Sequence, residues 1–290
     1  MISMSDLFDI VVPVGPNDVG RIHRQLAQLR FAVGRRRTFV VTARRADGLP
    51  QFDGCETVDE ESFPFKLADV AAAHGARPRN GWYFQQLLKL YAGRVIPGIL
   101  DRWLVVDADT FLLRPVEFVV ARVQNAQLAY YGGADETGET EHLPAYAIGP
   151  ELRHEPYFAH MARLHPLLAR VHPDWSGICH HMVFQKCHVD LLFELVDDFH
   201  SRGNQAGAPK KEFWQVFLEC VDPADYDAAG ASEYEIYFNF VQRFFPREVV
   251  VRPLRWANAP AAVLGNSAVL GDSAALTGRD LDYVSCHYYL

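Results

Sequence analysis

The sequence has no excess of positive charge. Its 28 lysine and arginine residues stand against 36 acidic ones, which gives a formal net charge of −8. A nucleic-acid-binding protein usually carries a basic excess or a basic stripe. The one dense basic run, Arg35–Arg37 with Arg44 and Arg45 nearby, is typical of a solvated turn. We therefore expect no nucleic-acid partner.

Long apolar runs are also missing. No stretch approaches the roughly 18 residues that a membrane-spanning helix needs. Residues Met1–Asp6 contain no basic segment followed by an apolar one, so we expect no signal peptide. These patterns favour a protein without a transmembrane segment and a cytoplasmic location.

Paired cysteine motifs are absent. The five cysteines are scattered and odd in number, and no CxxC occurs, so we expect reduced thiols rather than a disulfide framework. The stretch Cys179–His181, followed by Cys187 and His188, contains metal-ligand residue types, but the spacing fits no standard zinc module.

The chain does contain enough apolar sequence for a large core, because 49% of its 290 residues are hydrophobic. Apolar runs alternate with helical patterns through the first half. We expect strands at Phe8–Val14, Thr38–Thr42 and Arg102–Leu113, and helices from Asp18, as the cap, to Phe31, at Phe65–His74 and at Gly81–Arg94. This alternation predicts an α/β fold, Rossmann-like in class, with a mostly parallel central sheet flanked by helices.

The second half is less regular. We expect strands at Gln127–Tyr131, Val183–Gln185 and Val249–Arg252, helices at Asp190–Arg202, Glu212–Cys220 and Glu233–Phe245, an acidic loop at Asp135–Glu141, and a mobile loop at Ala257–Ala275. The last residues, Asp282–Leu290, are aromatic, and we expect them to pack against the protein.

Asp107 and Asp109 follow the apolar run Trp103–Val106. In an extended chain, both side chains would point to the same side, about 7 Å apart. Two such carboxylates suit Mg²⁺ or Mn²⁺, which often share their ligands with phosphates. The carboxyl end of an open parallel sheet is also where ligands bind. The alternative is a pair of acids that cap a turn between a strand and a helix.

Trp103–Leu112 resembles the DxD strand of GT-A-fold glycosyltransferases. Val11–Val14 resembles their first strand, whose end contacts the nucleotide, and Gly81–Leu90 resembles the helix before the DxD strand in bacterial and viral members. His287 resembles the C-terminal histidine that completes the metal site in several families of this fold.

The resemblance implies one GT-A domain over residues 1–290. Residues 1–130 would form the nucleotide-sugar-binding half, and residues 131–290 the acceptor-binding half, with a C-terminal segment at the metal site. It implies that Asp107, Asp109 and His287 hold Mn²⁺ or Mg²⁺, and that Val14 and Ala108 contact the donor. The donor would be a UDP-sugar and the acceptor a glycan or another hydroxyl compound. The chemistry agrees, because a cation that bridges the diphosphate stabilises the leaving group.

The helix expected at Gly81–Arg94 has a distinctive polar stripe. Trp82, Gln85, Gln86 and Lys89 fall within one narrow arc opposite the apolar face. An ordinary exposed face would carry more charge and no tryptophan. We interpret Gln85 and Lys89 as contacts to phosphate or sugar hydroxyls and Trp82 as a substrate contact, with a plain solvent-facing stripe as the alternative.

Trp175–Met182 reads as a loop that enters a strand, in the position where GT-A enzymes bind the sugar or the acceptor. The resemblance therefore makes Gly177, His180 and His181 substrate-binding candidates, with a structural turn as the alternative. His287 has an alternative of its own, which is simple packing among the aromatic residues near it.

Inverting sugar transfer needs a carboxylate that deprotonates the acceptor hydroxyl. Glu233 and Glu235 are the candidates, and we favour Glu233, because Ser232 and Glu235 have the spacing of a capping box. A retaining mechanism would need no such base, and the sequence leaves it open.

Three other functions compete. A haloacid-dehalogenase-like phosphatase also opens with a strand and DxD, but Phe111 stands where that family wants Thr or Val, and here a complete βαβα block precedes the motif. A sugar nucleotidyltransferase should carry a glycine-rich basic loop, which Gly15–Asp18 lacks. A non-catalytic carbohydrate-binding pseudoenzyme would bind the nucleotide sugar without turnover.

Overall fold

The structure is a computed structural model that describes residues 8–34, 36–123, 140–148, 154–201, 210–260 and 281–287. The strand expected at Gln127–Tyr131 and nearly all of the acidic loop at Asp135–Glu141 lie outside these residues. So does most of the loop expected at Ala257–Ala275.

A five-stranded sheet lies at the centre, in the order β3-β2-β1-β4-β8. Its strands are β1 (Asp9–Val14), β2 (Thr38–Thr42), β3 (Glu56–Asp59), β4 (Arg102–Val106) and β8 (His181–Gln185). The first four strands run parallel, and β8 pairs with β4 in the antiparallel direction. The predicted α/β class with a mostly parallel central sheet is confirmed.

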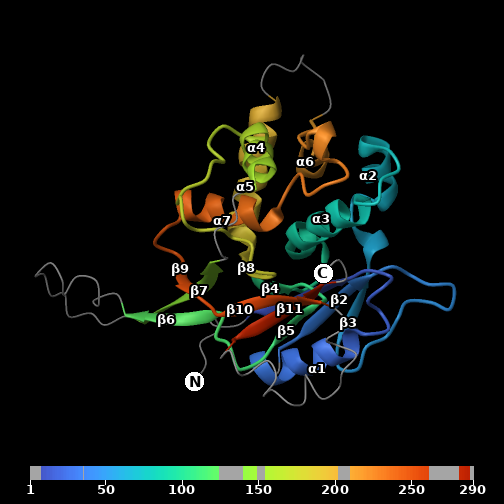
Figure 1. Ribbon diagram of the computed structural model, residues 1–290, viewed down its shortest axis with the longest axis vertical. Helices are drawn as coiled ribbons and strands as arrows, with labels where there is room; N and C mark the ends of the chain where they lie inside the picture. The colour runs from blue at the N-terminus through green and yellow to red at the C-terminus, as the bar shows by residue number, and fades with distance from the viewer. Residues whose placement is uncertain are drawn as a thin grey trace, which may run out of the picture.

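Helices cover both faces of this sheet. Figure 1 shows α1 on one side and the remaining helices on the other, with α3 next to the sheet. The helices are α1 (Ile22–Val33), α2 (Leu67–His74), α3 (Asn80–Val95), α4 (Glu155–Leu164), α5 (Lys186–Ser201), α6 (Phe213–Glu219) and α7 (Glu233–Phe244). Short 3₁₀ turns occur at Glu60–Ser62 and Pro223–Asp225.

Two smaller sheets flank the centre, with orders β10-β11-β5 and β6-β7-β9. Their strands are β5 (Thr110–Leu112), β6 (Val119–Val123), β7 (Thr140–Ile148), β9 (Val250–Pro253), β10 (Trp256–Pro260) and β11 (Tyr283–His287). Because β11 pairs with β5 immediately after the acidic pair, Tyr283–His287 packs against the protein, as expected.

The strand expected at Arg102–Leu113 is interrupted, and that prediction was wrong. The chain turns after β4, with Thr110 N–H donating to the carbonyl of Asp107 over 3.0 Å, and then enters a different sheet as β5. The cause is the long-range pairing of β5 with β11, which local apolar periodicity cannot reveal. Asp107 and Asp109 therefore lie in a turn rather than on one side of an extended strand.

Two further local predictions were wrong. Helix α1 begins at Ile22 with Arg21 as its N-cap, and Asp18 contributes its backbone carbonyl rather than a side-chain cap. Residues Ala257–Pro260, which were expected to start a mobile loop, instead belong to β10, because this strand pairs in parallel with β11.

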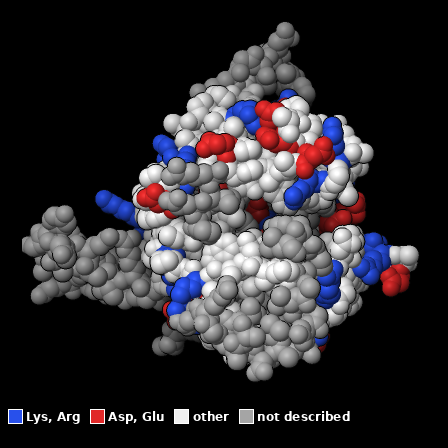
Figure 2. Space-filling view, viewed as in Figure 1, with Lys and Arg blue, Asp and Glu red and all other residues white. Residues whose placement is uncertain are grey.

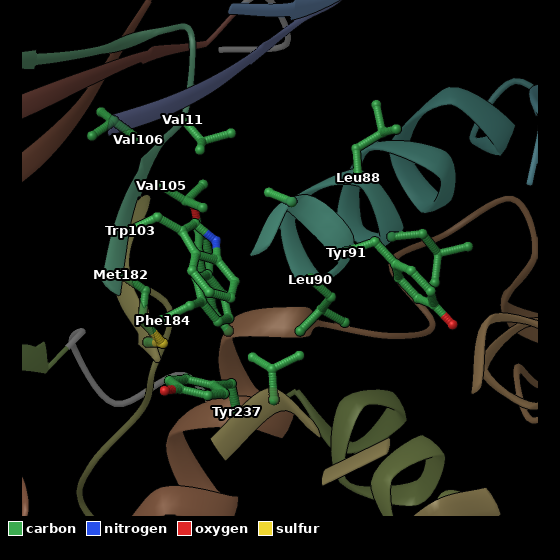
Figure 3. Close-up of a cluster of buried hydrophobic side chains, with 14 of the residues drawn as sticks. Val11, Leu88, Leu90, Tyr91, Trp103, Val105, Val106, Met182, Phe184 and Tyr237 are labelled. Atoms are coloured by element: carbon green, nitrogen blue, oxygen red, sulfur yellow. The ribbon is translucent and has the colours of Figure 1, made fainter. Parts of the chain in front are cut away.

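The main core lies between the central sheet and helices α3 and α7. Figure 3 shows Trp103 pointing from β4 toward α3, with Phe184 and Tyr237 close to its ring. The Trp103 and Phe184 rings stack with centroids 5.8 Å apart. Gly93 permits this packing, because a Cβ at that position would lie 2.2 Å from the Trp103 ring. Helix α3 is thus fixed against the strand that carries the acidic pair.

Acidic and basic side chains are interspersed on the face seen in Figure 2. Within the ranges that the structure describes, no helix is long and apolar enough to cross a membrane.

Candidate functional site

The strand order places a switch point between β1 and β4. The chain passes from β1 to β2 and β3 on one side and then returns to β4 on the other. Ligands of open α/β sheets bind outside the carboxyl ends of the strands at such a point. Val14 ends β1 and Asp107 directly follows β4, so both lie at this edge. The side chain of Val14 is buried, which leaves its backbone as the group at the edge.

The acidic turn is tied to the segment that enters β8. The backbone N–H of Asp107 donates to the carbonyl of His180 over 3.0 Å. The Asp107 and Asp109 side chains keep 18% and 26% of their surface exposed, so both carboxylates lie at the rim of the core. Ala108 is half-buried between them.

His287 reaches Asp109 from the other end of the chain. Its Nδ1 lies 2.8 Å from Asp109 Oδ2, and its Nε2 lies 2.9 Å from Asn258 Oδ1. The backbone supports this contact, since the N–H of Cys286 donates to the carbonyl of Asp109 over 2.8 Å. The pairing of β11 with β5 therefore delivers the imidazole to the acidic turn.

These two groups fit a divalent cation in part. Adjacent ligands of an octahedral Mg²⁺ ion lie about 3 Å apart, which matches the 2.8 Å between His287 Nδ1 and Asp109 Oδ2. Asn258 could hold the ring in the tautomer that turns a lone pair on Nδ1 toward the cation. Among the residues that the structure describes, no group of three His, Cys, Asp or Glu side chains is arranged to hold a metal. A cation there would thus need phosphate oxygens or water as well.

Asp107 belongs to a second, buried charge cluster. Lys89 Nζ of α3 lies 2.6 Å from Asp107 Oδ1 and 2.6 Å from Glu233 Oε1 at the start of α7. The hydroxyl of Tyr234 donates to the same Asp107 oxygen over 2.8 Å. The side chains of Lys89 and Glu233 are each only 4% exposed. The structure therefore places Lys89 as the counter-ion of two carboxylates.

The pKa shifts follow from this arrangement. Burial acts to raise the pKa of Asp107, but the charges of Lys89 and His180 outweigh it and hold that pKa well below its usual value. Burial raises the pKa of Glu233, although Lys89 opposes the shift. Burial would lower the pKa of Lys89, and the two carboxylates reverse this and raise it. Glu233 is thus the carboxylate of the pair that binds a proton more readily.

The other residues of the polar stripe on α3 contact different parts of the protein. The side chain of Gln85 is half-buried and donates to the carbonyl of Pro13, 3.4 Å away, at the end of β1. Gln86 is buried and accepts from the N–H of Glu233 over 3.0 Å. Trp82 is half-buried and packs against Tyr157. The alternative of a plain solvent-facing stripe was wrong, because α7 covers part of it.

His180 lies between the Asp107 carboxylate and the ring of His287. Its Nδ1 is 3.4 Å from Asp107 Oδ2, and its ring centroid is 5.0 Å from that of His287. Its backbone φ is +58°, the left-handed region that few residues other than glycine adopt. Strain of this kind clusters at functional sites.

His181 and Gly177 do not join this cluster. His181 is buried on β8, where its ring contacts those of Phe118 and Tyr283. Gly177 is also buried, and a Cβ there would lie 2.6 Å from the carbonyl of Tyr234 in α7. Both residues therefore pack in the core, and direct substrate contact by either stays a prediction.

Glu235 likewise has a structural role. Ser232 caps α7 by accepting from the N–H of Glu235 over 3.2 Å, as the spacing predicts. The Glu235 carboxylate accepts from the Ser176 hydroxyl and, over 2.8 Å, from Asn239 Nδ2. Since the side chain is fully buried with both oxygens bonded, it holds the segment before His180, and a catalytic role for Glu235 stays a prediction.

Asp18 is a site residue that the sequence reasoning missed. Burial raises the pKa of its carboxyl, and the nearby charge of Asp109 raises it further. Asp18 thus lies near the acidic turn, in the loop after β1. Tyr234 and Asn258 were missed as well, because their partners are 127 and 29 residues away in the chain.

No protein-family model and no curated protein matches the sequence. Among solved structures, mouse xyloside xylosyltransferase 1 in its apo form is 10% identical, with 97% of this chain and 98% of that chain covered and a TM-score of 0.44. The galactosyltransferase LgtC, in complex with donor and acceptor sugar analogs, is 11% identical over 96% of this chain and 86% of that chain, with a TM-score of 0.41. An active-site mutant of LgtC is 12% identical, with the same coverage and TM-score. All three of these solved structures are of glycosyltransferases.

The side chains at the carboxyl edge of the sheet form two connected groups. The site joins a carboxylate–imidazole pair at the rim to a buried cluster of one lysine and two carboxylates. The first suits a hard cation with a phosphate ligand, and the second contains a carboxylate with raised proton affinity.

Proposed function

We propose that this protein is a metal-dependent glycosyltransferase that transfers a sugar from a UDP-sugar to a hydroxyl group of a saccharide or another acceptor. The observation that carries the proposal is the contact between Asp109 and His287 over 2.8 Å, at the edge where open α/β sheets bind their ligands. Residues 1–130 would form the donor-binding half and residues 131–290 the acceptor-binding half.

Asp109 and His287 would hold the cation, Mn²⁺ or Mg²⁺, together with diphosphate oxygens. A bound cation supplies charge stabilisation to the departing diphosphate. Asp107 would accept a hydrogen bond from the ribose or from a water on the cation, since one of its oxygens is already bonded to Lys89 and Tyr234. Gln85 and the backbone at Val14 and Ala108 would contact the donor at the same edge.

Glu233 would act as the base that takes the proton of the acceptor hydroxyl. Its raised pKa suits this role, because a general base works best when its pKa approaches the working pH. The carboxylate is buried in the ligand-free chain, and catalytic hydrogen bonds often form only in the substrate complex. His180 at the rim and Trp82 on α3 would contact the sugar or the acceptor.

A thermal-shift panel of nucleotide sugars with and without Mn²⁺, followed by an assay for released nucleoside diphosphate, tests the proposal. At a UDP-sugar concentration of about 100 times Kd, Tm should rise by about 5 °C or more, and only with Mn²⁺ present. Asp109→Ala should abolish the shift, whereas Glu233→Gln should keep it and stop transfer. Glu194→Ala, on the exposed face of α5, is the matched control and should behave as the wild type.

No metal-dependent shift with any nucleotide sugar would contradict the proposal. Binding without release of the diphosphate would instead favour a non-catalytic sugar-nucleotide-binding protein. A phosphoryl group trapped on Asp107 from a simple phosphate ester would favour a phosphatase.

A further inference from the structure

Two hydrogen-bond donors meet at one oxygen of Asp107. Lys89 Nζ lies 2.6 Å from Asp107 Oδ1, and the Tyr234 hydroxyl lies 2.8 Å from the same atom. The two donors also contact each other, because Lys89 Nζ is 4.5 Å from the centroid of the Tyr234 ring. Both side chains are buried, and the polar atoms of both are directed at Asp107.

These donors come from two helices that are locked together. The N–H of Glu233, at the start of α7, donates to Gln86 Oε1 of α3 over 3.0 Å. Lys89, one turn further along α3, bonds the carboxylate of the same Glu233. Ser232 caps α7 in the same turn. The Tyr234 hydroxyl and the Lys89 ammonium are therefore fixed relative to each other before any ligand binds.

The two donors restrict the orientation of the Asp107 carboxylate. With Oδ1 bonded to two buried donors, the orientation of the carboxylate is restricted, and Oδ2 lies 3.4 Å from His180 Nδ1. A charged group held by two hydrogen bonds in a poorly solvated place keeps one orientation, because each of those bonds is strong.

We propose that Tyr234 and Lys89 are positioning residues that fix Asp107 so that only its Oδ2 is presented to the donor nucleotide and its cation. This inference rests on the proposed function, because it assigns the task that the fixed carboxylate performs. It also gives Lys89 a different role from direct phosphate contact. Groups that orient a ligand-binding residue commonly contribute tenfold or more to affinity.

The test compares two substitutions that each remove one buried hydroxyl from α7. Tyr234→Phe removes the donor to Asp107. Tyr237→Phe, one turn away, removes a hydroxyl that accepts from Gln185 N–H over 2.9 Å and lies away from the site. Both retain the ring, so both should fold. The probes are Mn²⁺ alone, followed by electron paramagnetic resonance, and UDP with Mn²⁺, followed by calorimetry.

We expect Tyr234→Phe to weaken the binding of UDP with Mn²⁺ by about tenfold, and Tyr237→Phe to leave it within about twofold of wild type. Adding Tyr234→Phe to Asp107→Asn should cause no further loss, because the hydroxyl acts through that carboxylate. Unchanged affinity in Tyr234→Phe, or equal losses in both tyrosine variants, would overturn the inference and leave the proposed function standing. If the wild type binds neither probe, the proposed function itself fails.

Discussion

Asp109 Oδ2 and His287 Nδ1 lie 2.8 Å apart although 178 positions separate these residues in the chain. The contact exists because β11 pairs with β5 in the antiparallel direction, with Ser285 opposite Thr110, and the two side-chain hydroxyls of that pair lie 2.8 Å apart. The carboxylate and the imidazole are therefore held by a sheet and not by a flexible tail.

His287→Ala should lower the affinity for Mn²⁺ by at least about tenfold, because one of two protein ligands is lost. The fold should persist, since the strand pairing uses backbone groups. Electron paramagnetic resonance of free Mn²⁺ measures the affinity, and circular dichroism reports the fold. His23→Ala, at an exposed position on α1, is the control. Equal Mn²⁺ affinity in wild type and His287→Ala would show that the imidazole is only packed.

Lys89→Met should destabilise the protein by about 3–5 kcal/mol, because it leaves the buried carboxylate of Glu233 and the partly buried one of Asp107 without their counter-ion. Removing one charge with Glu233→Gln in the same chain should restore part of the loss. Urea unfolding of the single and double variants measures both effects. A loss of less than about 1 kcal/mol in the free energy of unfolding of Lys89→Met would instead show that the ammonium is exposed to solvent.

The part of the site that the sequence predicts is the part that depends on local order. The apolar run Trp103–Val106 followed by acids predicts a strand that reaches a ligand-binding edge, and β4 covers this run, although it ends at Val106 and not at Leu113. The helix pattern at Gly81–Arg94 likewise predicts α3, which runs from Asn80 to Val95. Periodicity succeeds for these elements because each buries a face of its own.

The part of the site that the sequence does not predict depends on contacts between residues far apart in the chain. The polar arc on α3 predicts a face exposed to solvent or to ligand, but the sequence cannot show that Glu233 covers Lys89 from a helix 144 residues away. Nor can it show that the chain turns at Asp107, because β5 is defined by its partner β11. His287 was found only through the resemblance to GT-A enzymes.

His180→Gly should be more stable than His180→Ala. Both variants lose the imidazole and its contact with Asp107, but only alanine must adopt the φ of +58° with a Cβ. The left-handed conformation costs about 1–2 kcal/mol, and the greater freedom of glycine in the unfolded chain offsets part of this. We expect a difference of about 0.5–1 kcal/mol in the urea-derived free energy of unfolding. A more stable alanine variant would contradict the backbone conformation.

A last prediction concerns acid and the buried histidine His160 of α4. Its Nε2 bonds the carbonyl of Phe217 in α6 over 2.9 Å, while its Nδ1 is buried and has no hydrogen-bond partner among the residues that the structure describes. Burial lowers the pKa of His160 to about 4, and the charge of Arg163 contributes to the shift. The neutral ring is therefore the form that the folded protein favours.

The sign of the effect follows from proton uptake. Unfolded His160 binds a proton near its ordinary pKa of about 6.5, whereas the folded protein resists it down to about pH 4. The unfolded state thus binds more protons in this window, and the free energy of unfolding falls as the pH falls, by at most about 1.4 kcal/mol per pH unit from this group. His160→Gln, which keeps a donor for Phe217 but does not titrate, should flatten the dependence in urea unfolding between pH 7 and 4, by up to that slope. A His160→Gln profile as steep as that of the wild type would mean that the acid sensitivity arises elsewhere, for example at His74, whose pKa burial also lowers.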